Sequence, residues 1–325
     1  MKRNESKSPT PFFFLPLQGG VSREKPPVCD RFRGYTGRLE LSLVVDSKYL
    51  FVGSGAFEFG TGKGIGTPDV WWAFCRSNGR LCIPGTSLKG AVRSIVEAIS
   101  ASCVRQVRRE ETLSSRMYEP CRDPGNLCPA CRIFGTTGFR GRVCFADAFP
   151  RENVTTEVVK IGELWGPRRS EGRKFYRNGE AAVFSDRKPE KNRWFLEVVP
   201  EKTRFETTLF FENLEEGELG LLGYALGWEK KREEERLVLA FRPKIGGAKP
   251  RCFGTVQFVP KKVVLFEFSQ KALWKSRVLE GQDMHGFLVR CLEASKKIGL
   301  IREDALKLLR SMLKDREYSC PQDIY

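Results

Sequence analysis

The sequence predicts an α+β fold of the ferredoxin-like kind, in which two split βαβ units share one sheet. Two observations lead to this prediction: some segments alternate apolar and polar residues, as strands do, and others repeat apolar residues at helical spacing. The strand-like segments are 37–47, 141–149, 204–214 and two strands within 236–266. The helix-like segments are 82–98 and 215–231. The resulting order is strand–helix–strand, repeated once.

Around this pattern the chain divides into three parts. They are an N-terminal arm (1–35), one elaborated domain (36–265) with insertions at about 103–140 and 150–200, and C-terminal helices (266–325). The apolar "PFFFLPL" of the arm is expected to be buried. The insertion at 150–200 has little periodicity, and we expect it to be extended and partly flexible. The two C-terminal helices are expected near 284–298 and 302–315.

The charge of the chain indicates an anionic partner. Lys and Arg total 56 against 40 Asp and Glu, a net charge of +16 over 325 residues. Such a surplus favours nucleic acid, although it also serves solubility. No stretch reaches the roughly 18 apolar residues of a membrane span, so we expect a cytoplasmic protein without a membrane partner. Its 11 cysteines are then mostly reduced, and its single histidine, His285, leaves little room for histidine acid–base catalysis.

The segment "CIPGTSLKGAVRSIVEA", 82–98, combines a turn with the start of a helix. Helix N-termini offer free N–H groups and partial positive charge, to which Thr86 and Ser87 add hydroxyl groups. Lys89 and Arg93 are four residues apart and so lie on one helix face. These residues are expected to hold the phosphates of an RNA chain. The alternative is a helix capped by Thr86 or Ser87 that carries two solvated cations.

The loop "KIGGAKPRCFG", 244–254, also combines glycines with cations and is a second candidate phosphate-binding segment. Exposed backbone amides of a glycine-rich loop can bind phosphate oxygens, and cations strengthen that binding. The expected RNA-binding residues here are Lys244, Gly246, Gly247, Lys249 and Arg251. The alternative is an ordinary flexible connection between two strands.

Two further groups complete the expected RNA contacts. In "EGRKFYRNG", Arg173, Lys174 and Tyr176 place cations beside an aromatic ring, a combination that suits phosphate pairing and base stacking. A solvated hairpin is the alternative. Arg132, in "CPACRIFG", is added to the set.

A cluster of cysteines predicts a metal site. Cys128 and Cys131 form a CxxC pair, and Cys121 precedes Cys128 by seven residues. Thiolates at such spacing in a reducing compartment fit tetrahedral zinc. Cys103 is the preferred fourth ligand because it follows the first helix, and Cys144, in an expected strand, is the less favoured one. Four cysteines leave no open position, so the zinc is expected to be structural. Free buried thiols are the alternative.

Asp69 follows a long glycine-rich stretch. A carboxylate near an RNA backbone can hold a divalent ion or orient a 2′-hydroxyl group. Loop aspartates also commonly stabilise turns, and this remains the alternative.

Taken together, the motifs resemble those of the CRISPR-associated RAMP superfamily, the backbone subunits of type III RNA-targeting effectors. The segments that carry the resemblance are "IPGTSLKGAVR" (83–93), "CPACRIFG" (128–135), "FFENLEEGELGLL" (210–222) and "IGGAKPRCFGTVQF" (245–258). Their order covers most of residues 36–260. The "GRKFY" and "ENL…ELGLL" elements are similar to the branch found in type III variants and in fused single-chain effectors.

The resemblance implies a modified RRM palm that packs along a guide RNA (crRNA), with a zinc-bearing finger region and a thumb-like hairpin. It implies, as partners, the guide, a target single-stranded RNA and other effector subunits or copies of the chain. In nuclease members an aspartate before the IPG motif supports cleavage of the target with Mg²⁺ or another divalent ion, leaving a 2′,3′-cyclic phosphate and a 5′-hydroxyl.

Asp69 lies 15 residues before Pro84, close to where nuclease members place that aspartate. Those members commonly have a proline after the aspartate, whereas here Pro68 precedes it. Asp46 is a poorer candidate because it ends a strand. The main expectation is therefore a guide-binding, target-cleaving subunit, and the alternative is a non-catalytic scaffold or cap subunit. Metal-free trimming of the guide is disfavoured by the lone His285, and an unrelated zinc-bearing RNA-binding protein by the ordered motifs.

Overall fold

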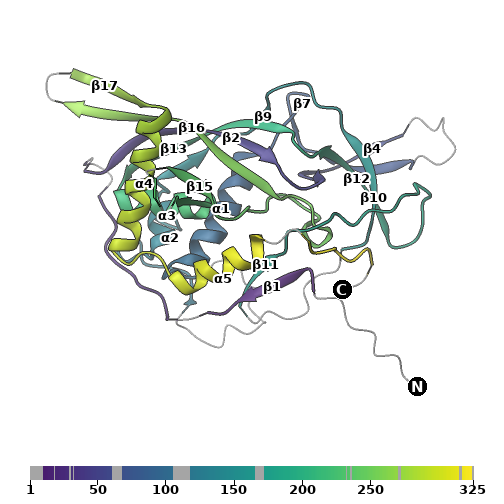
Figure 1. Ribbon diagram of the computed structural model, residues 1–325, viewed down its shortest axis with the longest axis horizontal. Coiled ribbons are helices and arrows are strands. Elements are labelled where there is room, and N and C mark those ends of the chain that lie inside the picture. The colour runs from purple at the N-terminus through teal and green to yellow at the C-terminus, as the bar shows by residue number, and fades with distance from the viewer. Residues whose placement is uncertain are drawn as a thin grey trace.

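A mixed α+β architecture is seen in the computed structural model, which describes residues 10–323 except 18, 29–30, 32, 61–67, 105–117, 165–171, 232, 235, 270–271 and 315–316. Two larger sheets and five α-helices make up most of the described chain. In Figure 1 one sheet crosses the upper part of the molecule with the helices beneath it, and the other lies to the right.

The six-stranded sheet forms the centre of the molecule. In spatial order its strands are β17 (Ala272–Leu279), β16 (Val256–Ser269), β2 (Tyr35–Val45), β13 (Arg204–Leu214) and β8 (Val143–Phe145), and β9 (Phe149–Pro150) also pairs with β13. Every neighbouring pair is antiparallel. The strands expected at 37–47, 141–149 and 204–214 are therefore confirmed.

Strand β2 shows why the sheet buries one face. Leu39, Leu41 and Leu43 alternate along it and are all buried under the helices. The intervening residues of β2 and β13 are mostly more exposed, which shows that the helices cover only one face of the sheet. At Gly37 a side chain has no room, since an added Cβ would lie 2.1 Å from the Val264 carbonyl oxygen. Close pairing of β2 with β16 thus depends on glycine at this position.

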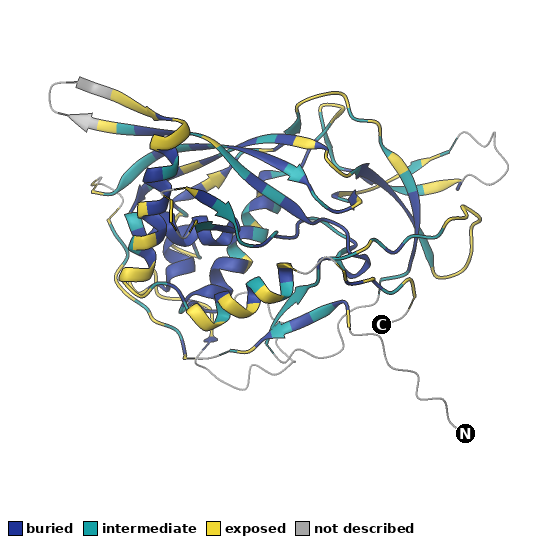
Figure 2. Cartoon of the chain, in the orientation of Figure 1, coloured by how far each residue is buried: buried dark blue, intermediate teal, exposed yellow. Residues whose placement is uncertain are grey.

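The helices pack together on the buried face of the sheet. They are α1 (Gly85–Ile99), α2 (Pro129–Phe134), α3 (Glu216–Ala225), α4 (Gly281–Lys297) and α5 (Glu303–Lys314). Figure 2 shows their buried sides turned toward the sheet and the exposed sides of α4 and α5 turned away. The helices expected at 82–98, 215–231 and near the C-terminus are confirmed, with shorter bounds for α3.

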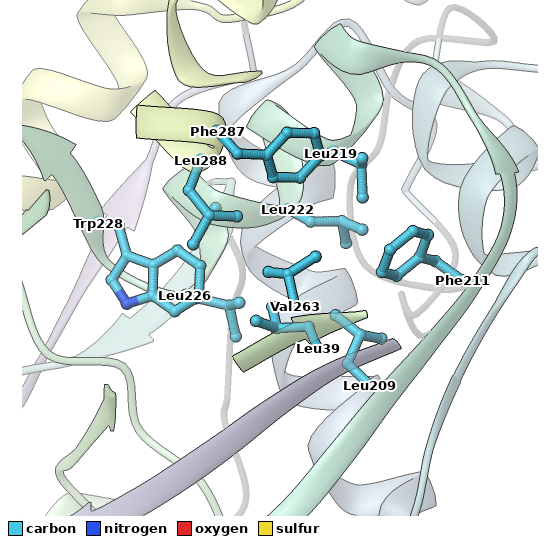
Figure 3. Close-up of a pocket in the computed structure, with 11 residues that line it drawn as sticks. Leu39, Leu209, Phe211, Leu219, Leu222, Leu226, Trp228, Val263, Phe287 and Leu288 are labelled. Atoms are coloured by element: carbon cyan, nitrogen blue, oxygen red, sulfur yellow. The ribbon is translucent and has the colours of Figure 1, made fainter. Parts of the chain in front are cut away.

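Helix α3 forms despite its glycines because they let it approach α4. At Gly220 an added Cβ would lie 1.9 Å from the Cys291 carbonyl oxygen. Figure 3 shows the apolar core beside this contact, where leucines of α3, Phe287 of α4 and strand residues such as Leu39 converge. The cavity left among them has a volume of about 10 Å³ and an apolar lining, too small and too apolar for a ligand. It is packing space within the core.

The second sheet lies at the right of Figure 1. Its order is β10 (Glu157–Gly162), β12 (Arg193–Pro200), β5 (Val70–Phe74) and β4 (Gly53–Phe59), with β3 (Tyr49–Leu50) also paired to β12. The sequence predicts little regular structure at 150–200. This prediction is wrong for the residues of β10 and β12, which form regular strands. Both strands are largely buried on this sheet, so their apolar runs lack the alternation of a half-exposed strand.

Three short strand pairs complete the fold. They are β1 (Phe12–Leu15) with β11 (Arg173–Tyr176), β6 (Arg76–Ser77) with β7 (Arg80–Leu81), and β14 (Trp228–Lys230) with β15 (Leu237–Leu239). Strand β1 is the "PFFFLPL" segment, and its Phe13 and Leu15 are buried as expected. The N-terminal arm is thus tied to the 150–200 insertion.

The C-terminal part differs from expectation in two ways. Strand β16 continues past residue 265 and forms with β17 a hairpin that projects at the upper left of Figure 1, before the helices begin. A disulfide links Cys252 to Cys320, whereas the sequence predicts close cysteine pairs at a metal site only. No described helix has both the length and the apolar character needed to cross a membrane.

Candidate metal centre and RNA-binding surface

Four buried cysteines converge beneath α1. Cys103 follows α1, Cys121 and Cys128 flank a turn, and Cys131 lies in the first turn of α2; their Sγ atoms all lie within 4.8 Å of one another. The Cys103 Sγ is 3.6 Å from the Sγ of both Cys128 and Cys131. Tetrahedral zinc with Zn–S bonds of about 2.3 Å requires sulfur–sulfur distances of roughly 3.8 Å. The four-cysteine cluster therefore fits zinc, with Cys103 as the fourth ligand and the exposed Cys144 outside it.

Backbone and side-chain donors surround the sulfur atoms. The Cys128 amide donates to the Cys121 Sγ at 3.4 Å, and the Cys103 amide donates to the Cys128 Sγ at 3.5 Å. Such donors stabilise thiolate, the form that binds metal.

Two arginines expected to bind RNA instead face the four-cysteine cluster. Arg93 donates to the Cys131 Sγ at 3.5 Å, to the Gly135 carbonyl oxygen at 2.9 Å and to Glu97 at 2.8 Å. Arg173, from β11, donates to the Ser102 carbonyl oxygen at 2.9 Å and pairs with Glu97 at 3.3 Å. Their side chains are only 13% and 9% exposed. Zinc with four thiolates carries net negative charge, and these guanidinium groups are placed to offset it.

The start of α1 is open at Thr86 and Ser87. Pro84 is the N-cap and provides no side-chain hydrogen bond, so the expectation that Thr86 or Ser87 caps the helix is wrong. The Gly85 amide is bonded to the Asp147 Oδ1 at 2.8 Å, and the Ser87 amide to the Pro84 carbonyl oxygen at 2.9 Å. Thr86 is exposed and Ser87 half-buried. The two hydroxyl groups are thus not used as caps.

Lys89 lies one turn further along α1. Its amine points toward Gly141, where an added Cβ would be 3.1 Å from the Lys89 Nζ. Burial lowers the pKa of Lys89, and the nearby Arg93 adds to that effect. A half-buried amine with a lowered pKa gains from an anion more than a solvated lysine does.

The loop 244–254 packs into the protein more tightly than expected. Arg251 is fully buried, and its guanidinium donates to the carbonyl oxygens of Glu163, Pro321 and Asp323 at 2.9, 2.5 and 2.6 Å. The Lys244 Nζ donates to the Phe253 carbonyl oxygen at 3.0 Å, and burial lowers the pKa of Lys244 well below its ordinary value. Arg251 and Lys244 therefore hold the loop and the C-terminal tail together.

Backbone packing also accounts for the two glycines of this loop. An added Cβ at Gly246 would lie 2.1 Å from the Phe51 carbonyl oxygen, and the Gly247 amide donates to that oxygen at 2.8 Å. Burial lowers the pKa of Lys249 as well. The loop is a close-packed connection and not an open one.

Lys174 and Tyr176 lie on β11 beside the N-terminal arm. The Lys174 Nζ is 3.8 Å from the centre of the Phe12 ring and 5.2 Å from that of Tyr176. Burial lowers the pKa of Lys174. The Lys174 amine thus contacts Phe12 across the β1–β11 pair and lies beside Tyr176, the ring expected to bind RNA, on its own strand.

Asp69 lies at the loop end of the β4–β5 hairpin, just before β5. Its carbonyl oxygen accepts the Gly60 amide at 2.8 Å, and its side chain is exposed. Among the described residues no donor contacts its carboxylate; the loop 61–67 lies outside them. Asp46, by contrast, pairs with Arg242 at 2.8 Å and is 9% exposed. Figure 1 places the β4–β5 hairpin away from α1, so Asp69 and the α1 residues form separate groups.

Arg132 lies beside three cations of the N-terminal arm that belong to none of the sequence motifs. It donates to the Glu24 Oε2 at 2.6 Å and lies 3.7 Å from Glu218. With Lys25, Arg31 and Arg33 it lines a cavity of about 620 Å³. The signal in the sequence is the basic stretch of the N-terminal arm, which forms no motif.

Comparison with known proteins gives one family. The model of the RAMP superfamily matches residues 50–257, more than half of the chain. No curated protein matches the chain in sequence. The matched span contains Asp69, the start of α1, the four-cysteine cluster and the loop 244–254.

Proposed function

Because the chain belongs to the RAMP superfamily, whose function is CRISPR-associated RNA binding, we propose that it is a guide-RNA-binding backbone subunit of a type III effector. Its net charge of +16 supports an RNA partner. In this proposal the partners are the guide (crRNA), the target single-stranded RNA and neighbouring effector subunits or copies of the chain.

The central sheet is proposed to be the RRM-like palm. Its strand order supports this, because two strand–helix–strand units interleave in it: β2–α1–β8 and β13–α3–β16. β13 lies between the strands of the first unit, and β2 lies between those of the second. Each unit is thus a split βαβ unit, as in a ferredoxin-like fold. The four-cysteine region corresponds to the finger, and the β10–β12 region to the thumb-like insertion.

The guide is proposed to lie across the start of α1. The observation that supports this most is the open first turn, where Thr86 and Ser87 do not serve as caps and Lys89 adds a half-buried cation. The hydroxyl groups of Thr86 and Ser87 can donate to phosphate oxygens, and such contacts position an RNA chain without reading bases. Lys174 and Tyr176 are retained as proposed contacts, whereas Arg93, Arg173 and Arg251 are assigned to holding the fold.

Zinc is proposed as the structural metal of the four-cysteine cluster. The four Sγ atoms would be its ligands, and Arg93 would offset their charge. When bound, the ion supplies a rigid cross-link between the end of α1 and α2.

Cleavage of the target is proposed to depend on Asp69. The reaction expected is attack of a ribose 2′-oxygen on the adjacent phosphorus with loss of the 5′-oxygen, which leaves a 2′,3′-cyclic phosphate. A divalent ion such as Mg²⁺ would supply positive charge at that phosphate. Asp69 offers an exposed carboxylate that could hold this ion. It is the one carboxylate proposed for the role, and a single carboxylate is weak support for a catalytic site. A non-catalytic scaffold or cap subunit is therefore the alternative.

Asp69→Asn separates these two functions, because it removes the charge and keeps the size of the side chain. In a complex assembled with guide and end-labelled target, we expect the cleavage product of this subunit to form about 10²-fold more slowly or more, with guide binding unchanged. Glu201→Gln, an exposed carboxylate in the turn before β13, is the matched control. Undiminished cleavage by Asp69→Asn would leave the scaffold as the better function.

A further inference from the structure

A basic cavity lies under the N-terminal arm, apart from the RNA contacts proposed above. Its volume is about 620 Å³. The lining residues are Lys25, Pro27, Val28, Arg31, Arg33, Gly34, Arg132, Asn213 and Glu215. Four of them are cations and one is a carboxylate. This charge balance favours an anionic ligand.

Asn213 fixes the rim of the basic cavity. Its Oδ1 accepts the amides of Arg33 and Gly34, both at 2.8 Å, and its Nδ2 donates to the Arg31 carbonyl oxygen at 2.8 Å. The backbone of Asn213 itself has a φ of 51°, which asparagine tolerates better than most residues. One side chain thus holds Arg31 and Arg33 at the same edge, and both are exposed there.

Arg132 is the most buried cation of the lining. It is nine-tenths buried, with a relative exposure of 8%, yet its Nε makes no hydrogen bond to any described residue. Its nearest buried carboxylate, Glu218, is 3.7 Å away and already accepts a hydrogen bond from the buried Arg142. Its other partner, Glu24, has a side chain that is 65% exposed. The ion pairs with Glu24 and Glu218 thus hold the Arg132 guanidinium in the wall of the cavity, where it adds positive charge.

The one lining carboxylate, Glu215, offsets only one of the four positive charges. Glu215 is the N-cap of α3, and its side chain accepts the amide of Glu218 in a capping box. It is therefore already engaged with the helix. The three remaining cations of the lining, Lys25, Arg31 and Arg33, form no ion pair with a carboxylate in the part of the chain that the structure describes.

We propose that the basic cavity binds a nucleotide of an RNA chain through its phosphate, as a contact additional to the start of α1. The proposal rests on the RNA-binding function proposed above. A planar guanidinium group can donate two parallel hydrogen bonds to two oxygens of one phosphate, which favours phosphate as the anion. The volume exceeds that of a lone phosphate and is in the range that admits a small organic ligand. An internal phosphate and a 5′-terminal phosphate share this chemistry.

The test uses the full-length chain and a 3′-labelled single-stranded RNA, with either a 5′-phosphate or a 5′-hydroxyl. The pocket variant is Arg31→Gln with Arg33→Gln; the control is Arg236→Gln with Arg290→Gln, two exposed arginines elsewhere that give the same change in charge. We expect the pocket variant to bind roughly three- to tenfold more weakly than the control, with a salt slope shallower by about 0.7 for each phosphate that the variant no longer neutralises.

The outcomes separate the two proposals. Equal affinity of the pocket and control variants, with firm binding by the wild type, would overturn the basic cavity alone. Absence of RNA binding by the wild type would overturn the proposed function and the cavity with it. A weakening confined to 5′-phosphorylated RNA assigns the terminal phosphate, and an equal weakening with both RNAs assigns an internal one.

Discussion

Glu197 shows how single residues hold the hairpin that carries Asp69. It is buried in β12, and its carboxylate accepts the Phe74 amide at 2.8 Å and the Thr156 hydroxyl at 2.8 Å. Arg76 donates to both of its oxygens, at 2.7 and 2.5 Å, and reaches Glu58 of β4 at 3.1 Å. The network therefore ties β4 and β5 to the rest of the second sheet.

The network makes part of the stability depend on pH. Burial alone would raise the pKa of Glu197, but the hydrogen bonds from Arg76, Phe74 and Thr156 outweigh it, so the pKa lies below its ordinary value of 4.5. The stabilisation is therefore present above pH 4.5 and lost as the pH falls through the folded-state pKa. We expect urea unfolding to show that Glu197→Gln is less stable at pH 7 and loses less stability on acidification than the wild type. An equal acid sensitivity in both proteins would contradict this.

At the level of residues, the sequence groups the four cysteines that the structure brings together, but it does not reveal which cations are buried. The cysteine set follows from local spacing, which a metal constrains directly. Arg93, Arg173 and Arg251 were expected to face RNA, but a sequence gives the charge of a side chain and not its exposure. Arg251 is buried, and Arg93 and Arg173 are half-buried; all three donate to backbone carbonyl oxygens, contacts that arise only from the tertiary fold.

At the scale of elements, the glycine-rich α3 is explained by its contact with α4. Gly220→Ala places a methyl group 1.9 Å from the Cys291 carbonyl oxygen, so the helices must separate. We expect a loss of about 1–3 kcal/mol in the free energy of unfolding. Gly90→Ala is the matched control because its added methyl group meets nothing within 4 Å, and we expect it to stabilise α1 by about 0.5–1 kcal/mol. Denaturant titration distinguishes these opposite signs.

The four-cysteine cluster joins α1, α2 and the N-terminal arm, since Glu24 pairs with Leu127 one residue before Cys128. We expect elemental analysis of the freshly purified, reduced protein to give about one zinc per chain. Cys128→Ser should lower the metal content and the melting temperature, whereas Cys144→Ser, outside the cluster, should change neither. Wild-type protein that contains no metal and melts at the same temperature as Cys128→Ser would contradict the zinc assignment.

The elements also show which strands a sequence pattern can reveal. Strands β2 and β13 each have one buried face, so their alternation could be read from the sequence. Strands β10 and β12 are largely buried and pair with each other, and β12 also pairs with β5 at Leu196 and Trp72, far apart in the sequence. Such pairing leaves no local periodicity. The hairpin of β16 and β17 was not predicted for another reason, because its exposed Lys275 and Arg277 give it little apolar pattern.

At the scale of the whole molecule, the excess positive charge is divided between two tasks. Arg142 and Arg251 are buried, Arg93 is half-buried, and all three stabilise the fold. Lys89 and the cations of the basic cavity remain available for RNA. The net charge of +16 therefore overstates the number of phosphate contacts that the chain can make.

This division predicts how one lysine affects RNA binding. Lys89→Gln keeps the length of the side chain nearly unchanged and removes its charge at the start of α1. Because a phosphate contact carries no sequence information, we expect the affinity to fall by a similar factor for two RNAs of unrelated sequence, with a salt slope shallower by about 0.7. Fluorescence anisotropy at several salt concentrations measures both quantities, and Lys297→Gln on the exposed end of α4 is the control. A weakening seen with only one of the RNAs would instead assign base recognition to this surface.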